Sequence, residues 1–223
     1  MMYQKVLITG GNGLVGRHLR EILHHPASPR RHIYDLLNQD EVHNMLKKYK
    51  PDDVVHLAAR VGGIVDNITN PVDYYEQNIL MNTNVLKSCH EHNVDRVIAI
   101  ATSCSYPDVV ESYPMVEDNF FDGKPPHDNF SYAMSKRAMV AHIDAYVKQY
   151  NKRWCYLIPC NLYGEHDKYE EHHSHFISAL IKKIHQSKDN VEIKLIEISA
   201  NNACNVGISW VGAVCVSLDR PGE

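Results

Sequence analysis

Short apolar runs alternate with longer amphipathic stretches along this chain, and the alternation is its strongest structural signal. The apolar runs predict strands at Lys5–Thr9, His32–Tyr34, Asp53–Ala58, Val94–Ala101, Trp154–Ile158 and Val191–Ile196. The longer stretches predict helices from the first glycine turn to about Leu23, and then over Asn38–Tyr49, Pro71–His92, Asn129–Tyr150 and His172–Gln186. Strands that alternate with helices in this way favour an α/β fold with a doubly wound parallel sheet.

A glycine-rich turn joins the first predicted strand to the first helix, in the order Gly10-Gly11-Asn12-Gly13-Leu14-Val15-Gly16. In such a Gly-x-x-Gly-x-x-Gly turn, the first glycine permits the tight bend and the second lets a pyrophosphate approach the backbone. The third lets the helix pack closely on the strand, and the helix N-terminus faces the phosphates. The position at the start of an α/β chain predicts a Rossmann dinucleotide site, and a merely tight strand–helix turn is the alternative.

The second strand of such a fold is expected next, but the sequence leaves little room for it. Two prolines, Pro26 and Pro29, precede the three strand-like residues His32–Tyr34. Arg30 and Arg31 could bind the 2′-phosphate of a dinucleotide, or they could be a solvated pair in a loop.

A later loop over Asp108–Asp128, rich in proline, aspartate and glycine, could cover a substrate.

Tyr132 and Lys136 are four residues apart in a predicted helix, so their side chains share one face. An ammonium beside a phenol is expected to lower the pKa of the phenol, which suits a proton donor near neutral pH. Thr102 or Ser103, at the end of the fourth predicted strand, could supply a hydroxyl that orients a carbonyl oxygen. With a bound dinucleotide, these groups predict carbonyl reduction of the short-chain dehydrogenase/reductase type, whereas the pair alone could be surface residues.

Composition narrows the class of protein. The chain has 223 residues, of which 44% are hydrophobic and 22% charged, with a formal net charge of -4, as in a soluble globular protein. This charge offers no basic field for nucleic acid or a membrane surface, and no apolar run approaches the roughly 20 residues of a membrane span. Six cysteines without a Cys-x-x-Cys pair, and no signal peptide, predict free thiols and a cytoplasmic location.

Histidines and glutamates gather between His166 and His175, but the cluster lacks a partner motif with zinc spacing. No metal is therefore expected.

The chain resembles the GDP-L-fucose synthase family, NADP-dependent epimerase/reductases that act on GDP-4-keto-6-deoxymannose. The resemblance runs from Tyr3 to about Leu195. It rests on ITGGNGLVG (Ile8–Gly16), HLAARVGGIVDNITNP (His56–Pro71), NILMNTNVL (Asn78–Leu86), TSCSYPD (Thr102–Asp108), PPHDNFSYAMSKR (Pro125–Arg137), NLYGEHD (Asn161–Asp167) and SHFISAL (Ser174–Leu180).

The resemblance implies a role for each matching residue. Tyr132 and Lys136 become the reductase pair with Thr102 as their hydroxyl partner, and Cys104 and His175 become the acid/base pair that epimerises C3 and C5. Both carbons flank the C4 ketone, so their protons are acidic, and both side chains can keep a pKa near neutrality. The implied NADP(H) contacts are Gly10, Asn12, Gly13, Leu14, Val15, Gly16, Asp35, Leu36, Leu57, Ala58, Ala59, Ser103, Lys136, Pro159, Asn161, Leu162 and His175. The family also implies a GDP-sugar substrate and a homodimer formed through helices 71–92 and 129–150.

The C-terminal part departs from the family. We expect an NADP-binding Rossmann domain over residues 1–173 and a remnant of the substrate-binding lobe over 174–223, with a divergent tail from about 196. Lys183 stands where the family tends to have a substrate-facing arginine, which keeps the charge but loses the bidentate grip. Ile196–Glu223 does not align with the family's lobe and looks like a truncated or frame-shifted end; its Gly207–Leu218 part is apolar and uncharged.

The resemblance therefore implies an NADP-dependent enzyme that converts GDP-4-keto-6-deoxy-D-mannose to GDP-L-fucose, with turnover impaired by the shortened lobe. Two alternatives stay open. The chain could be a non-catalytic variant that acts only by pairing with a full-length subunit. It could also be a related nucleotide-sugar epimerase or dehydratase, although a simple 4-epimerase has no need of Cys104 and His175.

Overall fold

A parallel sheet forms the centre of the computed structural model, which describes residues 5–110, 113–167 and 176–186. Within these residues, the sheet has four strands in the order β1 (Val6–Thr9), β2 (Asp53–His56), β3 (Arg96–Ile100) and β4 (Cys155–Leu157). All three neighbouring pairs run parallel, with Asp53 opposite both Val6 and Arg96, and Ile98 opposite Cys155. The prediction of a parallel Rossmann-type sheet is confirmed.

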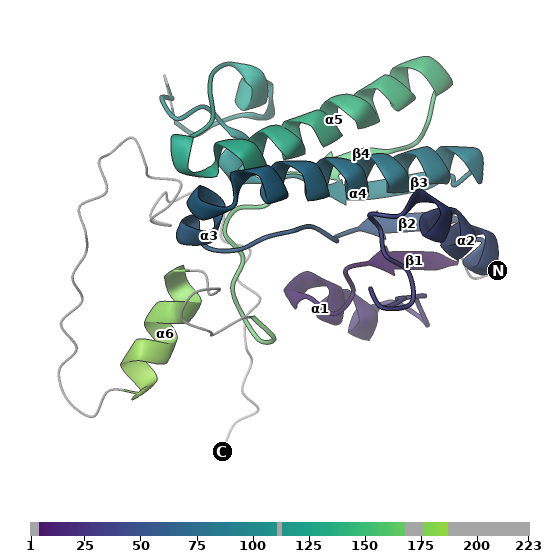
Figure 1. Cartoon of the computed structure of the whole chain (residues 1–223), viewed down its shortest axis with the longest axis horizontal. Coiled ribbons are helices and arrows are strands. Elements are labelled where there is room, and N and C mark those ends of the chain that lie inside the picture. The colour runs from purple at the N-terminus through teal and green to yellow at the C-terminus, as the bar shows by residue number, and fades with distance from the viewer. Residues whose placement is uncertain (1–4, 111–112, 168–175, 187–223) are drawn as a thin grey trace.

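Helices lie on both faces of this sheet (Figure 1). The long helices α4 (Pro71–Glu91) and α5 (Phe130–Tyr150) lie side by side over one face, with α2 (Gln39–Tyr49) beside α4. Helix α1 (Leu14–Ile22) lies on the opposite side of the sheet, and α3 (Ile64–Thr69) precedes α4. Helix α6 (Phe176–Gln186) is the last described element, and three short 3-10 helices are Ser103–Ser105 (η1), Glu117–Phe121 (η2) and His127–Asn129 (η3).

Local sequence explains where two of the helices begin. The Oδ1 of Asn38 accepts hydrogen bonds from the backbone N–H groups of Asp40 and Glu41, at 3.0 and 3.3 Å, and so caps α2. Pro71 occupies the first turn of α4, where its missing N–H costs nothing. Helix α3 was not predicted from the sequence, because six residues give too short an amphipathic pattern to stand out.

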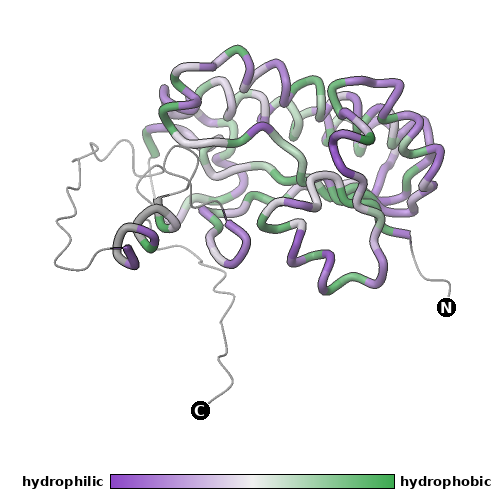
Figure 2. The backbone as a smooth tube through the Cα atoms, turned by 60° about the horizontal axis from the view of Figure 1, so that its bottom comes forward, coloured by the Kyte–Doolittle hydropathy of each residue, from purple (hydrophilic) through white to green (hydrophobic). Residues whose placement is uncertain are grey.

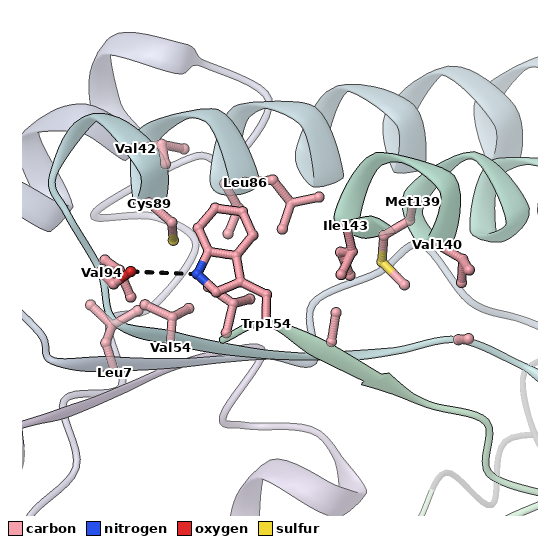
Figure 3. Packing of buried hydrophobic residues seen from close by; sticks show 14 of the residues in the cluster. Leu7, Val42, Val54, Leu86, Cys89, Val94, Met139, Val140, Ile143 and Trp154 are labelled. Carbon is pink, nitrogen blue, oxygen red and sulfur yellow. Dashed lines mark hydrogen bonds between the residues drawn. The ribbon is translucent and has the colours of Figure 1, made fainter. Parts of the chain in front are cut away.

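The core lies between the sheet and the pair α4/α5 (Figure 3). Val54 on β2 is buried while Val55 is only half-buried, so one face of the sheet carries most of the packing. The indole Nε1 of Trp154, just before β4, donates to the carbonyl of Val94 at 3.4 Å. Figure 2 shows the same arrangement as an apolar centre surrounded by polar helices and loops.

The prediction of a strand at His32–Tyr34 is wrong, because residues 31–33 form a turn. What remains of the second strand is a single residue, Ala27, which lies before the predicted strand and forms one parallel bridge with Leu7. Its N–H donates to the carbonyl of Val6 and its carbonyl accepts from Ile8, both at 2.8 Å. Pro26 and Pro29 flank this bridge, and a proline cannot donate to a strand ladder, so the pairing does not extend.

Some predictions fall outside the described residues. The predicted strand Val191–Ile196 and the divergent tail lie there, and the predicted helix His172–Gln186 is described only from Phe176. Within the described part, no helix combines the length and the apolar character needed to cross a membrane.

Candidate active site

The glycine-rich turn between β1 and α1 packs so closely that a side chain would not fit at Gly10 or Gly16. Gly10 has a φ of +72°, and its carbonyl accepts from the N–H of Gly13 at 3.0 Å. A Cβ built on Gly16 would lie 2.4 Å from the Cα of Gly11, and one on Gly10 would lie 2.7 Å from the backbone N of Ala58. Leu14 and Val15 then begin α1, whose N-cap is Gly13. This close turn at a helix N-terminus fits the pyrophosphate of a dinucleotide.

A buried hydrogen-bond chain joins the ends of β1 and β2 to α4. The Oγ1 of Thr9 and Nδ1 of His56 are 2.7 Å apart, and Nε2 of His56 is 2.9 Å from Oδ1 of Asn82. Burial lowers the pKa of His56 to about 4, the charge of Lys136 adds to this, and the bond to Asn82 opposes it. His56 is therefore neutral at pH 7. Its polar side chain inside the apolar run DVVHLA was the available sign of this network, and sequence reasoning missed it.

Lys136 connects α5 to the carboxyl end of β3 by a hydrogen bond. Its Nζ donates to the carbonyl oxygen of Ile100 at 2.7 Å and lies 6.0 Å from the ring centroid of Tyr132. One turn of α5 is held in the same way, since the Oγ of Ser105 donates to the carbonyl of Ala133 at 3.1 Å. The structure thus brings the predicted Tyr–Lys pair to the edge where the parallel strands end.

The pKa values of this pair differ from the sequence expectation. Burial lowers the pKa of Lys136 to about 8. The pKa of Tyr132 is raised, chiefly by burial, with Cys104 and Tyr74 adding to the rise and a hydrogen bond with Thr102 opposing it. The expectation of a lowered pKa for Tyr132 was wrong, because desolvation of the buried phenolate is the largest effect on this group. Tyr132 is accordingly a protonated phenol at neutral pH.

Thr102, Ser103 and Cys104 lie directly after β3, the last two in η1. The Oγ1 of Thr102 accepts from the backbone N–H of Cys104 at 3.3 Å and so fixes the turn. Burial raises the pKa of the Cys104 thiol, and the hydrogen bond with Thr102 opposes the rise. The expectation of a near-neutral pKa for Cys104 was therefore wrong, and the neutral thiol is the stable form.

Most of the other predicted cofactor residues also lie where strands end. Leu57, Ala58 and Ala59 follow β2, and Pro159, Asn161 and Leu162 follow β4. The loop after β4 reaches α1, where Nε2 of His18 lies 3.3 Å from the carbonyl of Glu165. Asn12 lies in the glycine turn, where its Oδ1 accepts from Arg20 at 3.2 Å.

Asp35 and Leu36 lie between the remnant of the second strand and α2. The backbone N–H of Asp35 donates to Oε2 of Glu41 at 2.6 Å, and the carbonyl of Leu36 accepts from Asn84 at 2.9 Å. Asp35 is thus bonded to α2, and Leu36 is bonded to α4. His175 and the side chain of Lys183 lie outside the described part, so the structure does not place either of them against the site.

Residues 5–110, 113–167 and 176–186 contain no group of three or more His, Cys, Asp or Glu side chains that could hold a metal ion. Most of the cluster between His166 and His175 lies outside these ranges, so its prediction stays open.

Substitution of Gly16 by alanine tests the fit of a dinucleotide to the glycine turn. The added methyl group would meet the backbone of Gly11 and Gly10, so the turn must open. We expect NADPH affinity to fall by roughly tenfold or more, since overpacking costs about 1–3 kcal/mol. Fluorescence titration with NADPH measures this, and Ile22→Ala, on the exposed side of the same helix, serves as the control. Unchanged affinity in Gly16→Ala would show that no phosphate lies against this turn.

The buried ammonium of Lys136 makes the stability of the chain depend on pH. The pKa of Lys136 is about 8 in the folded chain, and its ordinary value of 10.5 applies to the unfolded chain. Between pH 8 and pH 10.5, the unfolded chain therefore holds a proton that the folded chain has lost. The free energy of unfolding, relative to Lys136→Met, should therefore rise by roughly 3 kcal/mol from pH 8 to pH 10.5. Urea unfolding of both proteins across this range measures the difference. A difference that stays constant with pH would contradict the assigned burial.

Comparison with known proteins places this geometry in a family. The sequence model of the NAD dependent epimerase/dehydratase family matches residues 6–200. A probable GDP-L-fucose synthase from Drosophila melanogaster is 35% identical over 190 residues, which cover 82% of this chain and 59% of the relative. A GDP-L-colitose synthase from Yersinia pseudotuberculosis is 36% identical over 202 residues, covering 85% of this chain and 64% of the relative.

A solved structure gives the same picture. The GDP-L-fucose synthetase from Naegleria fowleri bound to NADP superposes with a TM-score of 0.75 at 29% identity, covering 87% of this chain and 67% of that one. The chain spans about three fifths of the length of the curated relatives it matches. The match over residues 6–200, together with the glycine turn and the parallel sheet, shows that the chain belongs to the NAD dependent epimerase/dehydratase family.

Proposed function

We propose that this chain carries the catalytic core of an NADP-dependent epimerase/reductase that converts GDP-4-keto-6-deoxy-D-mannose to GDP-L-fucose. The observation that carries the proposal is the convergence of Tyr132, Lys136, Thr102 and Cys104 at the carboxyl end of β3, on the edge of the sheet where the glycine turn follows β1. Similarity to GDP-L-fucose synthases at 32–35% identity supports the substrate class. NADP bound to the Naegleria fowleri relative supports the cofactor.

Reduction at C4 needs a proton donor for the developing alkoxide. When bound, a reduced nicotinamide supplies the hydride for the carbonyl carbon. Tyr132 is a protonated phenol and donates the proton. The hydroxyl of Thr102, which hydrogen-bonds with Tyr132, orients the carbonyl oxygen of the substrate. The ammonium of Lys136, 6.0 Å from the ring centroid of Tyr132, stabilises the phenolate that remains after proton transfer.

Epimerisation at C3 and C5 needs a base on one face of the sugar and a proton donor on the other. Cys104 is a neutral thiol next to Tyr132, so its ground state suits the donor. His175 is the base in this proposal, and Lys183 binds the pyrophosphate of the GDP-sugar. Asp35, Leu36, Leu57–Ala59, Ser103 and Pro159–Leu162 line the cofactor in the same proposal.

A second substrate is favoured by one comparison. The similarity to a GDP-L-colitose synthase, at 36% identity, supports a related GDP-4-keto sugar as the substrate of the same site.

We also propose that α4 and α5 pair two chains into a homodimer, so that this chain can join a copy of itself or a longer subunit. Both helices carry exposed apolar side chains, namely Val72, Leu80, Val147 and Tyr150. A contiguous apolar patch marks a protein–protein interface, and these side chains would contribute to such a patch. The described cysteines Cys89, Cys104 and Cys155 are free thiols, and free thiols support the proposed cytoplasmic location.

Two variants separate the two half-reactions. Tyr132→Phe should lower NADPH oxidation with GDP-4-keto-6-deoxymannose by roughly 100-fold or more, because it removes the proton donor, while NADPH binding persists. Cys104→Ala should instead abolish inversion at sugar C3 or C5, because the proton donor on the second face is lost, and NMR of the sugar in D₂O without NADPH measures this inversion. Exposed Cys155→Ala is the control for loss of a thiol.

The outcomes discriminate the proposed activities. Inversion that persists in Cys104→Ala would remove this thiol from the epimerisation. Full NADPH oxidation in Tyr132→Phe would remove the phenol from the reduction. NADPH binding by a wild-type chain that shows neither exchange nor oxidation would favour the non-catalytic alternative.

A further inference from the structure

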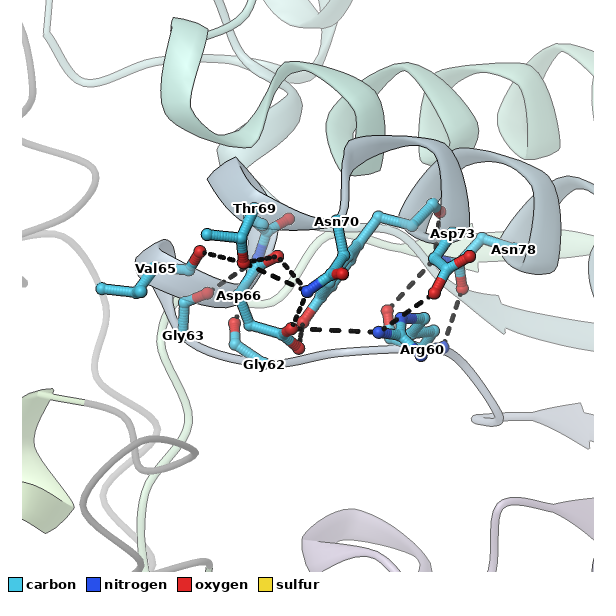
Figure 4. Close-up of polar contacts among 11 residues, drawn as sticks. Arg60, Gly62, Gly63, Val65, Asp66, Thr69, Asn70, Asp73 and Asn78 are labelled. Atoms are coloured by element: carbon cyan, nitrogen blue, oxygen red, sulfur yellow. Dashed lines mark hydrogen bonds and ion pairs between the residues drawn. The ribbon is translucent and has the colours of Figure 1, made fainter.

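A polar cluster links the loop after β2 to the start of α4 (Figure 4). The guanidinium of Arg60 lies 3.8 Å from Oδ1 of Asp66 and 3.6 Å from Oδ2 of Asp73. Its backbone is held at the same time, since its N–H donates to Asn78 at 2.9 Å and its carbonyl accepts from Asn78 at 3.1 Å. Asn78 is fully buried, so these bonds are shielded from water. The loop is thereby fixed through both the backbone and the side chain of Arg60.

Tyr74 connects this cluster to the candidate catalytic tyrosine. Its ring is fully buried and lies perpendicular to the ring of Tyr132, with centroids 6.2 Å apart. Its hydroxyl donates to Oδ2 of Asp66 at 2.6 Å, and the guanidinium of Arg60 lies 5.0 Å from its ring centroid. A Cβ on Gly62 would lie 2.3 Å from the hydroxyl oxygen, so glycine lets the loop close over it. Tyr74 is thus held at its hydroxyl, its face and its edge.

We propose that Tyr74, anchored by Asp66 and Arg60, is a positioning residue that holds the ring of Tyr132 in its reactive orientation. Tyr132 lies in the first turn of α5, and an edge-to-face contact restricts the swing of its ring. A catalytic phenol must be held within about 0.5 Å of its productive position to donate well, so a rigid neighbour contributes to the rate. Burial and the contact with Asp66 raise the pKa of Tyr74, which keeps it a neutral donor while Tyr132 gives up its proton.

This inference rests on the proposed function, and steady-state kinetics of matched variants test it. Tyr74→Leu removes the ring edge and should lower kcat by roughly 10–100-fold, with KM and the Kd for NADPH changed less than about threefold. Tyr74→Phe keeps the ring but releases Asp66, and should lower kcat by a smaller factor of about 3–10. Tyr75→Leu, at the exposed neighbouring position, is the control and should leave kcat unchanged. A kcat within twofold of wild type in Tyr74→Phe and in any folded Tyr74→Leu would overturn the proposal.

A second measurement does not need turnover. With ring-labelled tyrosine, the NMR signals of Tyr132 can be assigned by their loss in Tyr132→Phe. A held ring should flip slowly and give separate or broadened signals for its two sides, and these should merge in Tyr74→Phe or Tyr74→Leu but not in Tyr75→Leu. Free flipping of Tyr132 in the wild-type chain would overturn the positioning role. Slow flipping in a chain without reductase activity would instead overturn the proposed function and leave the positioning role standing.

Discussion

The bond between the Lys136 ammonium and the carbonyl oxygen of Ile100 is the contact on which the candidate site depends. Burying an ammonium is costly, and burial lowers the pKa of Lys136 to about 8, so the charge persists at neutral pH only with good partners. The bond fixes the start of α5 against the end of β3. Arg137 strengthens the same junction by donating to the carbonyl of Ser105 at 2.8 Å. Tyr132, Thr102 and Cys104 are neighbours because this junction is rigid.

The glycine turn between β1 and α1, at the other end of the candidate site, is fixed by steric constraint rather than by polar bonds. Gly16 lies so close to Gly11 that only glycine fits, and this brings the N-terminus of α1 to the end of β1. The second strand is reduced to the bridge at Ala27, and the side chain of Ser28 then lies against Gly11. Arg30 and Arg31 follow as exposed residues, and Nε of Arg31 lies 4.0 Å from Oδ1 of Asp35 in an exposed ion pair. The phosphate end of the site is thus more rigidly built than the adenosine end.

The sequence was sufficient for features that depend on local pattern. The strands β1, β2 and β3, the cap at Asn38 and the proline at the start of α4 all follow from runs of a few residues. The Tyr–Lys spacing also placed both side chains correctly on one helix, because four residues make about one turn. The bridge at Ala27 was missed because a single paired residue leaves no periodic signal.

Contacts between distant segments could not be predicted in the same way. Thr9, His56 and Asn82 form one chain although 73 residues separate its ends, and no local pattern encodes that meeting. The contact between Tyr74 and Tyr132 is of the same kind. The pKa values of Tyr132 and Cys104 depend on burial, which a sequence does not show. Sequence therefore indicates which groups are present, and packing decides their protonation.

The most direct test of this account is transfer of deuterium from NADPH labelled at both C4 positions to GDP-4-keto-6-deoxymannose by the wild-type chain. The account predicts a product with deuterium at C4 of the sugar, formed at the strand edge where Tyr132 lies. NMR and mass spectrometry of the sugar nucleotide identify the labelled carbon. A product without deuterium at C4, or an unchanged 4-keto sugar in the presence of bound NADPH, would contradict the claim that this chain carries a working reductase core.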